Sequence, residues 1–162
     1  MDANAALAET LRLLGPRLDA ARCSWTVIAS AAVALHTGHA AGVGDLDVLL
    51  DEAGAAAAFA ALGLPLTTGA GTDRFRSRLF GTWHGGPLAV ELFAGFELCS
   101  SGHWQEVRVE ERLEVEFQGV RAYVPSQAEL AAMLLRFGRE KDRARAAMLS
   151  ASGRFPSRSG SV

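Results

Sequence analysis

Two aspartates one residue apart interrupt an otherwise apolar stretch of the chain. They are Asp45 and Asp47 in the segment GDLDVLLDE. Residues two apart in a strand point to the same face, so both carboxylates would project together, with Leu46 and Val48 on the opposite face. Adjacent like charges are costly unless a cation neutralises them. The pair is therefore a candidate site for Mg²⁺ or Mn²⁺, which prefer oxygen ligands.

A third acid favours this interpretation over the alternative, in which both aspartates sit at the solvent-exposed start of the strand. Glu91 interrupts another short apolar segment, PLAVELF. If the two strands are neighbours, three carboxylates converge on one point of a sheet, which solvation does not explain in two hydrophobic strands. A DxD pair also holds a metal in nucleotide-sugar glycosyltransferases, but those have a longer chain with a nucleotide-binding sheet ahead of the motif.

The elements that must position these acids follow from the spacing of apolar residues. The first half predicts a helix over 3–21 that could be interrupted at Gly15-Pro16, a strand over 25–29, a helix over 30–35 and, after the DLDVLL strand, a helix over 53–63. An order of helix, strand, helix, strand, helix is typical of α/β proteins.

The second half predicts hairpins and closing helices. DRFRSRLFGTWHGGPLAVELF indicates two strands joined by a Gly-Gly-Pro turn, with Arg74, Arg76 and Arg78 on one face. A loop containing Trp104 follows, and RLEVEFQGVRAYV indicates a second hairpin. Ser126 begins a helix, because Glu129 three residues later completes a capping box. Gly138 then separates or kinks two short helices.

Composition limits the class of protein. The chain has 162 residues, 49% hydrophobic and 21% charged, which predicts one domain over 1–150 and a flexible tail over 151–162. The net charge of −2 provides no basic field to recruit nucleic acid or an anionic membrane. No apolar run approaches the ~20 residues needed to cross a bilayer, and the N-terminus lacks a signal-peptide pattern. Cys23 and Cys99 suit free thiols, so a cytoplasmic location is expected.

In order and spacing, these segments resemble the nucleotidyltransferase superfamily related to DNA polymerase β, in its minimal bacterial form. That family has a strand, a Gly-Gly or Gly-Ser turn into a helix, a strand with an Asp-x-Asp pair and a third acid on a later strand. The corresponding segments here are WTVIAS, AAVALHTG, GDLDVLLDE and LAVELF. The ending is similar to that of small AbiEii-type and aminoglycoside nucleotidyltransferases, whose Arg-x-Lys-Asp signature falls on Arg139, Lys141 and Asp142.

The resemblance implies an α/β (α+β) nucleotidyltransferase fold: a small mixed, twisted sheet with helices mainly on one side and a helical C-terminal segment. It also implies transfer of a nucleoside monophosphate from an NTP, such as ATP, to a hydroxyl of an unknown small-molecule or protein acceptor. Asp45 and Asp47 would bridge two Mg²⁺ (or Mn²⁺) ions, and Glu91 would complete the ion that activates the acceptor.

The resemblance further suggests contacts to the triphosphate. Ser30, at the start of the helix after the first strand, would help to hold it with backbone N–H groups. Arg139, Lys141 and Arg76 are basic candidates for the same role, and for each of them a solvated surface position is the alternative. Asp142 is expected to orient a neighbouring base rather than to bind metal. Acceptor specificity would lie in loops such as 95–105.

Two departures from the family pattern leave a second hypothesis open. Ala29-Ser30 stands where the family has Gly-Gly or Gly-Ser, and the added methyl narrows the site or weakens NTP binding. The third acid is Glu91 rather than the more frequent Asp. The second hypothesis is a catalytically inactive nucleotidyltransferase-like protein that acts as a binding module, or as an antitoxin with a toxin-type protein partner.

Overall fold

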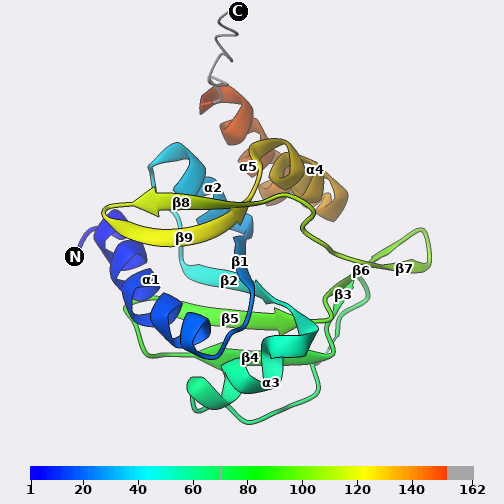
Figure 1. The fold of residues 1–162 in the computed structure, drawn as a ribbon. Coiled ribbons are helices and arrows are strands. Elements are labelled where there is room, and N and C mark those ends of the chain that lie inside the picture. Colours follow the sequence, from blue (N-terminus) through cyan, green and yellow to red (C-terminus); the bar gives the residue numbers. More distant parts are fainter. Residues whose placement is uncertain (70, 153–162) are drawn as a thin grey trace, which may run out of the picture.

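A computed structural model of the chain describes residues 1–69 and 71–152 (Figure 1). The helices are α1 (Ala3–Ala20), α2 (Ala29–Thr37), α3 (Glu52–Ala61), α4 (Gln127–Phe137) and α5 (Glu140–Ser152). The strands are β1 (Trp25–Ile28), β2 (Asp45–Leu50), β3 (Phe75–Arg76), β4 (Leu79–Trp83), β5 (Ala89–Ala94), β6 (Glu97–Ser100), β7 (His103–Glu106), β8 (Arg112–Phe117) and β9 (Val120–Pro125). The predicted tail from residue 151 overlaps the end of α5 and otherwise lies outside the described residues.

A mixed sheet with the strand order β1-β2-β5-β4 forms the centre of the fold. Strand β2 runs parallel to β5, whereas β1 pairs antiparallel with β2 and β4 pairs antiparallel with β5. The predicted hairpin at the Gly-Gly-Pro turn is thus confirmed as β4–β5. The mixed α/β architecture with flanking and C-terminal helices is confirmed as well.

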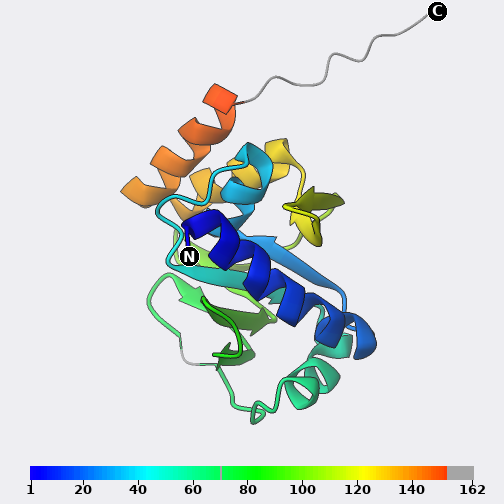
Figure 2. The same cartoon turned by 90° about the vertical axis from the view of Figure 1, so that its left-hand side faces the viewer.

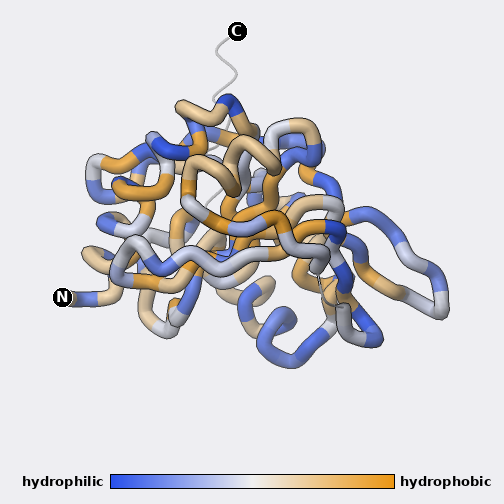
Figure 3. Tube along the Cα trace, turned by 90° about the horizontal axis from the view of Figure 1, so that it is seen from below, coloured by the Kyte–Doolittle hydropathy of each residue, from blue (hydrophilic) through white to orange (hydrophobic). Residues whose placement is uncertain are grey.

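One face of the sheet packs against the core. The alternating residues Leu46 and Val48 of β2 are fully buried, as are Val90 and Leu92 of β5. Figure 3 shows that the most hydrophobic parts of the trace run through the middle of the molecule. Burial of this face leaves the intervening residues of β2 and β5, which include the three acids, on the opposite face.

Helix α1 covers the buried face (Figure 2). Its leucines at helical spacing are 0% exposed: Leu7, Leu11, Leu14 and Leu18. It contacts the sheet at two strands, because the Trp25 indole on β1 donates to Asp19 over 2.9 Å and the N–H of Leu88, next to β5, donates to Thr10 over 3.0 Å. The interruption expected at Gly15-Pro16 is absent, and Pro16 lies inside the helix. Burial of the apolar stripe on both sides of Pro16 contributes more free energy to stability than the loss of one backbone hydrogen bond costs.

The region around β3 differs from the prediction. Residues 74–80 do not form one strand: β3 pairs with β6 in a separate sheet of order β3-β6-β7, and β4 joins the central sheet. Arg74, Arg76 and Arg78 therefore do not share a face. Arg74 donates to the Phe137 carbonyl, Arg76 pairs with Glu97, and Arg78 lies 3.5 Å from Glu52. The alternating pattern cannot reveal that Ser77 is the point at which the chain changes sheets.

Two strands were also missed. Residues 97–106, expected as loop, form the antiparallel pair β6–β7, which projects from the body of the molecule (Figure 1). Strand β7 is mostly exposed and β6 buries only Leu98 fully, so the sequence lacks the apolar alternation that marks a half-buried strand.

The C-terminal part follows the prediction closely. The second hairpin is confirmed as β8–β9, and Gly138 adopts a left-handed conformation (φ 69°) between α4 and α5. The Ser126 hydroxyl caps α4 by accepting from the Glu129 N–H over 3.2 Å. The carboxylate of Glu129 does not complete the capping box. It accepts instead from the backbone N–H groups of Glu110 and Glu111 and fastens the β7–β8 connection to α4. In the part of the chain described, no helix is long and apolar enough to cross a bilayer.

This double backbone contact makes Glu129 a stabilising residue. We expect Glu129→Ala to lower the free energy of unfolding by about 1–3 kcal/mol, because two N–H groups lose a charged acceptor. Urea unfolding followed by circular dichroism would measure the change. Glu140→Ala, at an exposed position of α5, is the matched control and should shift stability by no more than about 0.5 kcal/mol. Equal effects of the two substitutions would contradict the assignment.

Candidate active site

The three acids meet because β2 and β5 are adjacent and in register. Asp47 lies directly opposite Glu91 across this parallel pair, and Asp45 lies two residues earlier on the same face. Each carboxylate offers an oxygen atom, and these oxygens lie within 4.8 Å of one another. We call Asp45, Asp47 and Glu91 the acid triad.

The acid triad carries negative charge that its own residues do not neutralise. The pKa of Asp47 is raised from 3.8 to about 7, first because burial removes the carboxylate from water and then because Asp45 and Glu91 repel its charge. The charge of Arg145 acts in the opposite direction and lowers this pKa. Three converging carboxylates fit a divalent cation, and an all-oxygen donor set suits Mg²⁺ or Mn²⁺.

The acid triad faces a cavity of about 230 Å³. Arg139, Lys141 and Arg145, at the start of α5, contribute basic side chains to its lining. Four aromatic side chains also line it: Phe75, Phe93, Phe96 and Phe137. Ile28 and Ala29, where β1 passes into α2, complete the lining. The cavity thus combines acid, base and aromatic surfaces.

A buried carboxylate holds two of the basic side chains. Asp142 is 0% exposed and accepts from Arg139 twice, with distances of 2.6 Å to Nε and 3.1 Å to Nη2. It also accepts from the Arg139 backbone N–H over 3.3 Å, and Nη1 of Arg145 lies 3.7 Å from its Oδ1. Asp142 therefore orients neighbouring bases, as the sequence predicts.

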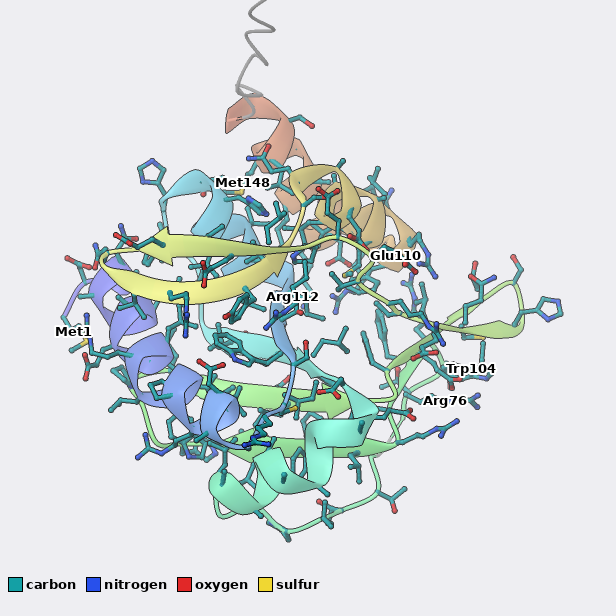
Figure 4. All side chains as sticks on the ribbon, in the orientation of Figure 1. Met1, Arg76, Trp104, Glu110, Arg112 and Met148 are labelled. Carbon is teal, nitrogen blue, oxygen red and sulfur yellow. The ribbon has the colours of Figure 1, made fainter. Side chains whose placement is uncertain are left out.

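The structure brings some of the predicted site residues together and leaves others apart. Arg139 and Lys141 line the same cavity as the acid triad. Ser30 lies in the first turn of α2, half-buried, but is not among the lining residues. Arg76 lies away from the cavity: its guanidinium stacks 4.1 Å from the centroid of the Trp104 ring, on the β3-β6-β7 sheet (Figure 4).

Sequence reasoning missed Arg145 and the aromatic wall. A signal for Arg145 was present, because it follows Lys141 by four residues and so shares its helix face. Phe75 and Phe96 carried no such signal. Their rings stack with centroids 5.7 Å apart only because β3 pairs with β6, and Phe96 immediately precedes β6.

Ala29 has an unusual backbone conformation. Its φ is +57°, in the left-handed region, and its side chain is only 5% exposed. The preceding residue, Ile28, pairs with Asp47, so this turn lies beside the acid triad. A left-handed conformation costs an L-residue about 1–2 kcal/mol and glycine almost nothing. Ala29 thus has a backbone conformation that glycine would adopt with little strain.

We expect Ala29→Gly to raise the free energy of unfolding by about 0.5–1 kcal/mol, because it relieves this conformation. The matched control is Ala34→Gly, which replaces an equally buried alanine in the regular part of α2 and should lower stability by about 1 kcal/mol. Both values come from chemical denaturation. Destabilisation by Ala29→Gly comparable to that of the control would contradict the strain at this turn.

Folding raises the pKa of Asp47, so this carboxyl binds its proton more tightly in the folded protein than in the unfolded one. Its contribution to stability is therefore complete below pH 3.8 and is lost as the pH rises to about 7. We expect Asp47→Asn, studied in EDTA, to be more stable than the wild type at pH 8 by about 1–3 kcal/mol.

Urea unfolding at pH 4 and pH 8 measures this pH dependence. Asp73→Asn, at an exposed loop position, is the control and should follow the wild type at both values. An equal difference in the free energy of unfolding between the wild type and Asp47→Asn at pH 4 and pH 8 would contradict charge repulsion within the acid triad.

The same arrangement of sheet and helices occurs in nucleotidyltransferase-like proteins. A candidate nucleotidyltransferase from Thermotoga maritima matches with a TM-score of 0.65 and 25% identity, over 88% of this chain and 94% of that chain. An antigenic nucleotidyltransferase-like protein from Paracoccidioides brasiliensis matches with a TM-score of 0.54 and 13% identity, over 91% and 75%. ANT(2")-Ia in complex with adenylyl-2"-tobramycin matches with a TM-score of 0.58 and 8% identity, over 88% of each chain.

No family model and no curated protein matches the chain. The structural matches nevertheless extend over most of its length and include an aminoglycoside nucleotidyltransferase. The resemblance to nucleotidyltransferases that the sequence suggests is therefore confirmed, and the chain has the nucleotidyltransferase fold.

Proposed function

We propose that the protein is a metal-dependent nucleotidyltransferase, which moves a nucleoside monophosphate from an NTP to a hydroxyl of a small-molecule or protein acceptor. One observation carries the proposal: the acid triad faces a cavity whose lining also holds three basic side chains. Carboxylates suit the divalent ions that accompany a nucleotide, and guanidinium and ammonium groups suit its phosphates. One domain over 1–150 would suffice, because the core draws on residues from α1 to α5 and the cavity on residues from β1 to α5.

Each part of the site has a role in this reaction. Asp45 and Asp47 would hold Mg²⁺ (or Mn²⁺), and Glu91 would complete the donor set. When bound, the metal supplies positive charge that polarises phosphoryl oxygens and stabilises the charge of the transition state. Arg139, Lys141 and Arg145 would bind the triphosphate. Ser30 would assist from the first turn of α2, whereas Arg76 is too far from the cavity to be part of this proposal.

The chemistry is an in-line displacement at the α-phosphorus of the NTP. The acceptor oxygen forms a new bond to this phosphorus, and the bond to the bridging oxygen of the β-phosphate breaks, so that pyrophosphate leaves. The acceptor hydroxyl loses its proton to a carboxylate, for which Glu91 on β5 is the candidate. The basic side chains then face the charge that develops on the leaving pyrophosphate.

A second cavity suits the acceptor. It measures about 420 Å³ and shares one lining residue, Phe96, with the first cavity. Its lining mixes acids and arginines from the ends of β1 and β2 and from the β7–β8 connection, including Glu52, Glu110 and Arg112. Such a polar surface could bind a molecule with several hydroxyl or amino groups. In the ANT(2")-Ia structure, the bound molecule is a nucleotide-linked acceptor.

The alternative is a catalytically inactive nucleotidyltransferase-like protein, acting as a binding module or an antitoxin-type protein with a toxin partner. Ala29 favours it, because the methyl stands where glycine would let phosphate approach the backbone. The two functions differ in one measurement: release of pyrophosphate from an NTP. An inactive protein would bind a partner or a nucleotide and release none.

We expect Asp45→Ala and Asp47→Ala each to reduce nucleotidyl transfer by at least about a thousandfold, since each removes a ligand of the metal that stabilises the transition state. The assay follows pyrophosphate and label transfer from α-phosphate-labelled NTPs to protein and small-molecule fractions of a bacterial extract, with Mg²⁺ or Mn²⁺.

The control is Asp73→Ala, at an exposed loop position, which should retain full transfer. Unchanged transfer in either triad variant would refute the proposed metal site. A folded wild-type protein that binds a protein partner and releases no pyrophosphate with any NTP would support the inactive alternative.

A further inference from the structure

The cavity holds opposite charges that do not pair with one another. Arg139, Lys141 and Arg145 line it together with the three carboxylates of the acid triad. Among residues 1–69 and 71–152, no ion pair within 4.0 Å joins these bases to the acid triad. The nearest competitor is Arg145, because its charge is the one that acts on Asp47.

Such a separation needs a physical cause. A guanidinium and a carboxylate attract strongly where water is partly excluded, and a flexible arginine side chain could cross the cavity to the acid triad. An arginine bound there would take the place of the cation, since both neutralise the same oxygens. Another carboxylate that binds the arginines would keep them from the acid triad.

Asp142 is that carboxylate. It is buried, it is bonded to Arg139 through two side-chain contacts, and Arg145 lies three residues further along α5 at 3.7 Å. Its position between the two arginines, at i−3 and i+3 on the helix, lets one carboxylate reach both. The backbone contact to Arg139 fixes the carboxylate itself.

We infer that Asp142 is a positioning residue, which retains Arg139 and Arg145 on the α5 side of the cavity and so leaves the acid triad open to a divalent cation. The inference rests on the metal site of the proposed function. It assigns Asp142 an effect on metal affinity, although Asp142 does not touch the metal ligands. It also explains how a site can hold bases for an anion and acids for a cation without closing on itself.

The test measures binding of Mn²⁺ alone, without nucleotide, by electron paramagnetic resonance of the free ion. We expect Asp142→Asn to bind Mn²⁺ about tenfold more weakly than the wild type, the lower end of the usual effect of residues that support metal ligands. The triple variant Asp142→Asn/Arg139→Gln/Arg145→Gln should recover most of this affinity, because both guanidinium groups that Asp142 retains are gone. A purely structural role for Asp142 predicts no recovery, since the two further substitutions repair no packing.

Two further variants complete the test. Asp51→Asn is the matched control: Asp51 also caps a helix, by accepting from the Gly54 N–H, and lies outside the cavity of the acid triad. It should lower stability but leave the affinity for Mn²⁺ unchanged. Arg145→Gln alone tests the inference even if Asp142→Asn does not fold. Because Asp142 already restrains Arg145, the affinity of Arg145→Gln for Mn²⁺ should differ from that of the wild type by less than about threefold, which is the effect of removing one screened charge.

The outcomes are distinguishable. Wild-type affinity in folded Asp142→Asn, no recovery in the triple variant, or Mn²⁺ binding at least about tenfold tighter in Arg145→Gln would each overturn the inference while leaving the metal site intact. Failure of the wild-type protein to bind Mn²⁺ would instead refute the metal site of the proposed function, and the inference with it.

Discussion

The parallel pairing of β2 with β5 is the contact on which the rest of the site depends. Asp45 and Asp47 are two residues apart on one strand, so their carboxylates alone could both stay in solvent without contacting each other. The pairing places Glu91 directly opposite Asp47, so that a third carboxylate reaches the same point of the sheet. The core stabilises this arrangement, because the alternate residues of both strands are buried beneath α1. The cost of gathering three acids is thus offset by the hydrophobic face of the same two strands.

The charged side chains around the cavity lie in three successive layers of alternating sign. The acid triad lies on the sheet, the three bases lie at the start of α5, and Asp142 lies behind the bases. Each layer has the opposite sign to the next. A cation and an anion bound between the first two layers would complete the neutralisation, as a metal bound to a nucleotide does. This order is the electrostatic feature that separates the cavity from an ordinary solvated surface.

Ala29 occupies a turn whose backbone conformation favours glycine. The backbone at this turn is left-handed although the residue is alanine, because Ile28 is held in the sheet beside Asp47 and α2 must begin immediately afterwards. The methyl group of Ala29 therefore occupies space in the cavity lining beside the acid triad.

The sequence by itself determined the main elements and the pairing of Asp45 with Asp47 on one strand face. Apolar periodicity located α1, β2, β5 and the β8–β9 hairpin, and period-two geometry put Asp45 and Asp47 on one face, because these signals are local. Only the tertiary structure decided which charged groups meet. Arg76 pairs with Glu97 and stacks on Trp104, and residues 74–80 are divided between two sheets. Arg145 and the aromatic wall joined the acids, and Asp142 was buried between two arginines. Such contacts join elements far apart in the chain, and the spacing of residues within one segment carries no information about them.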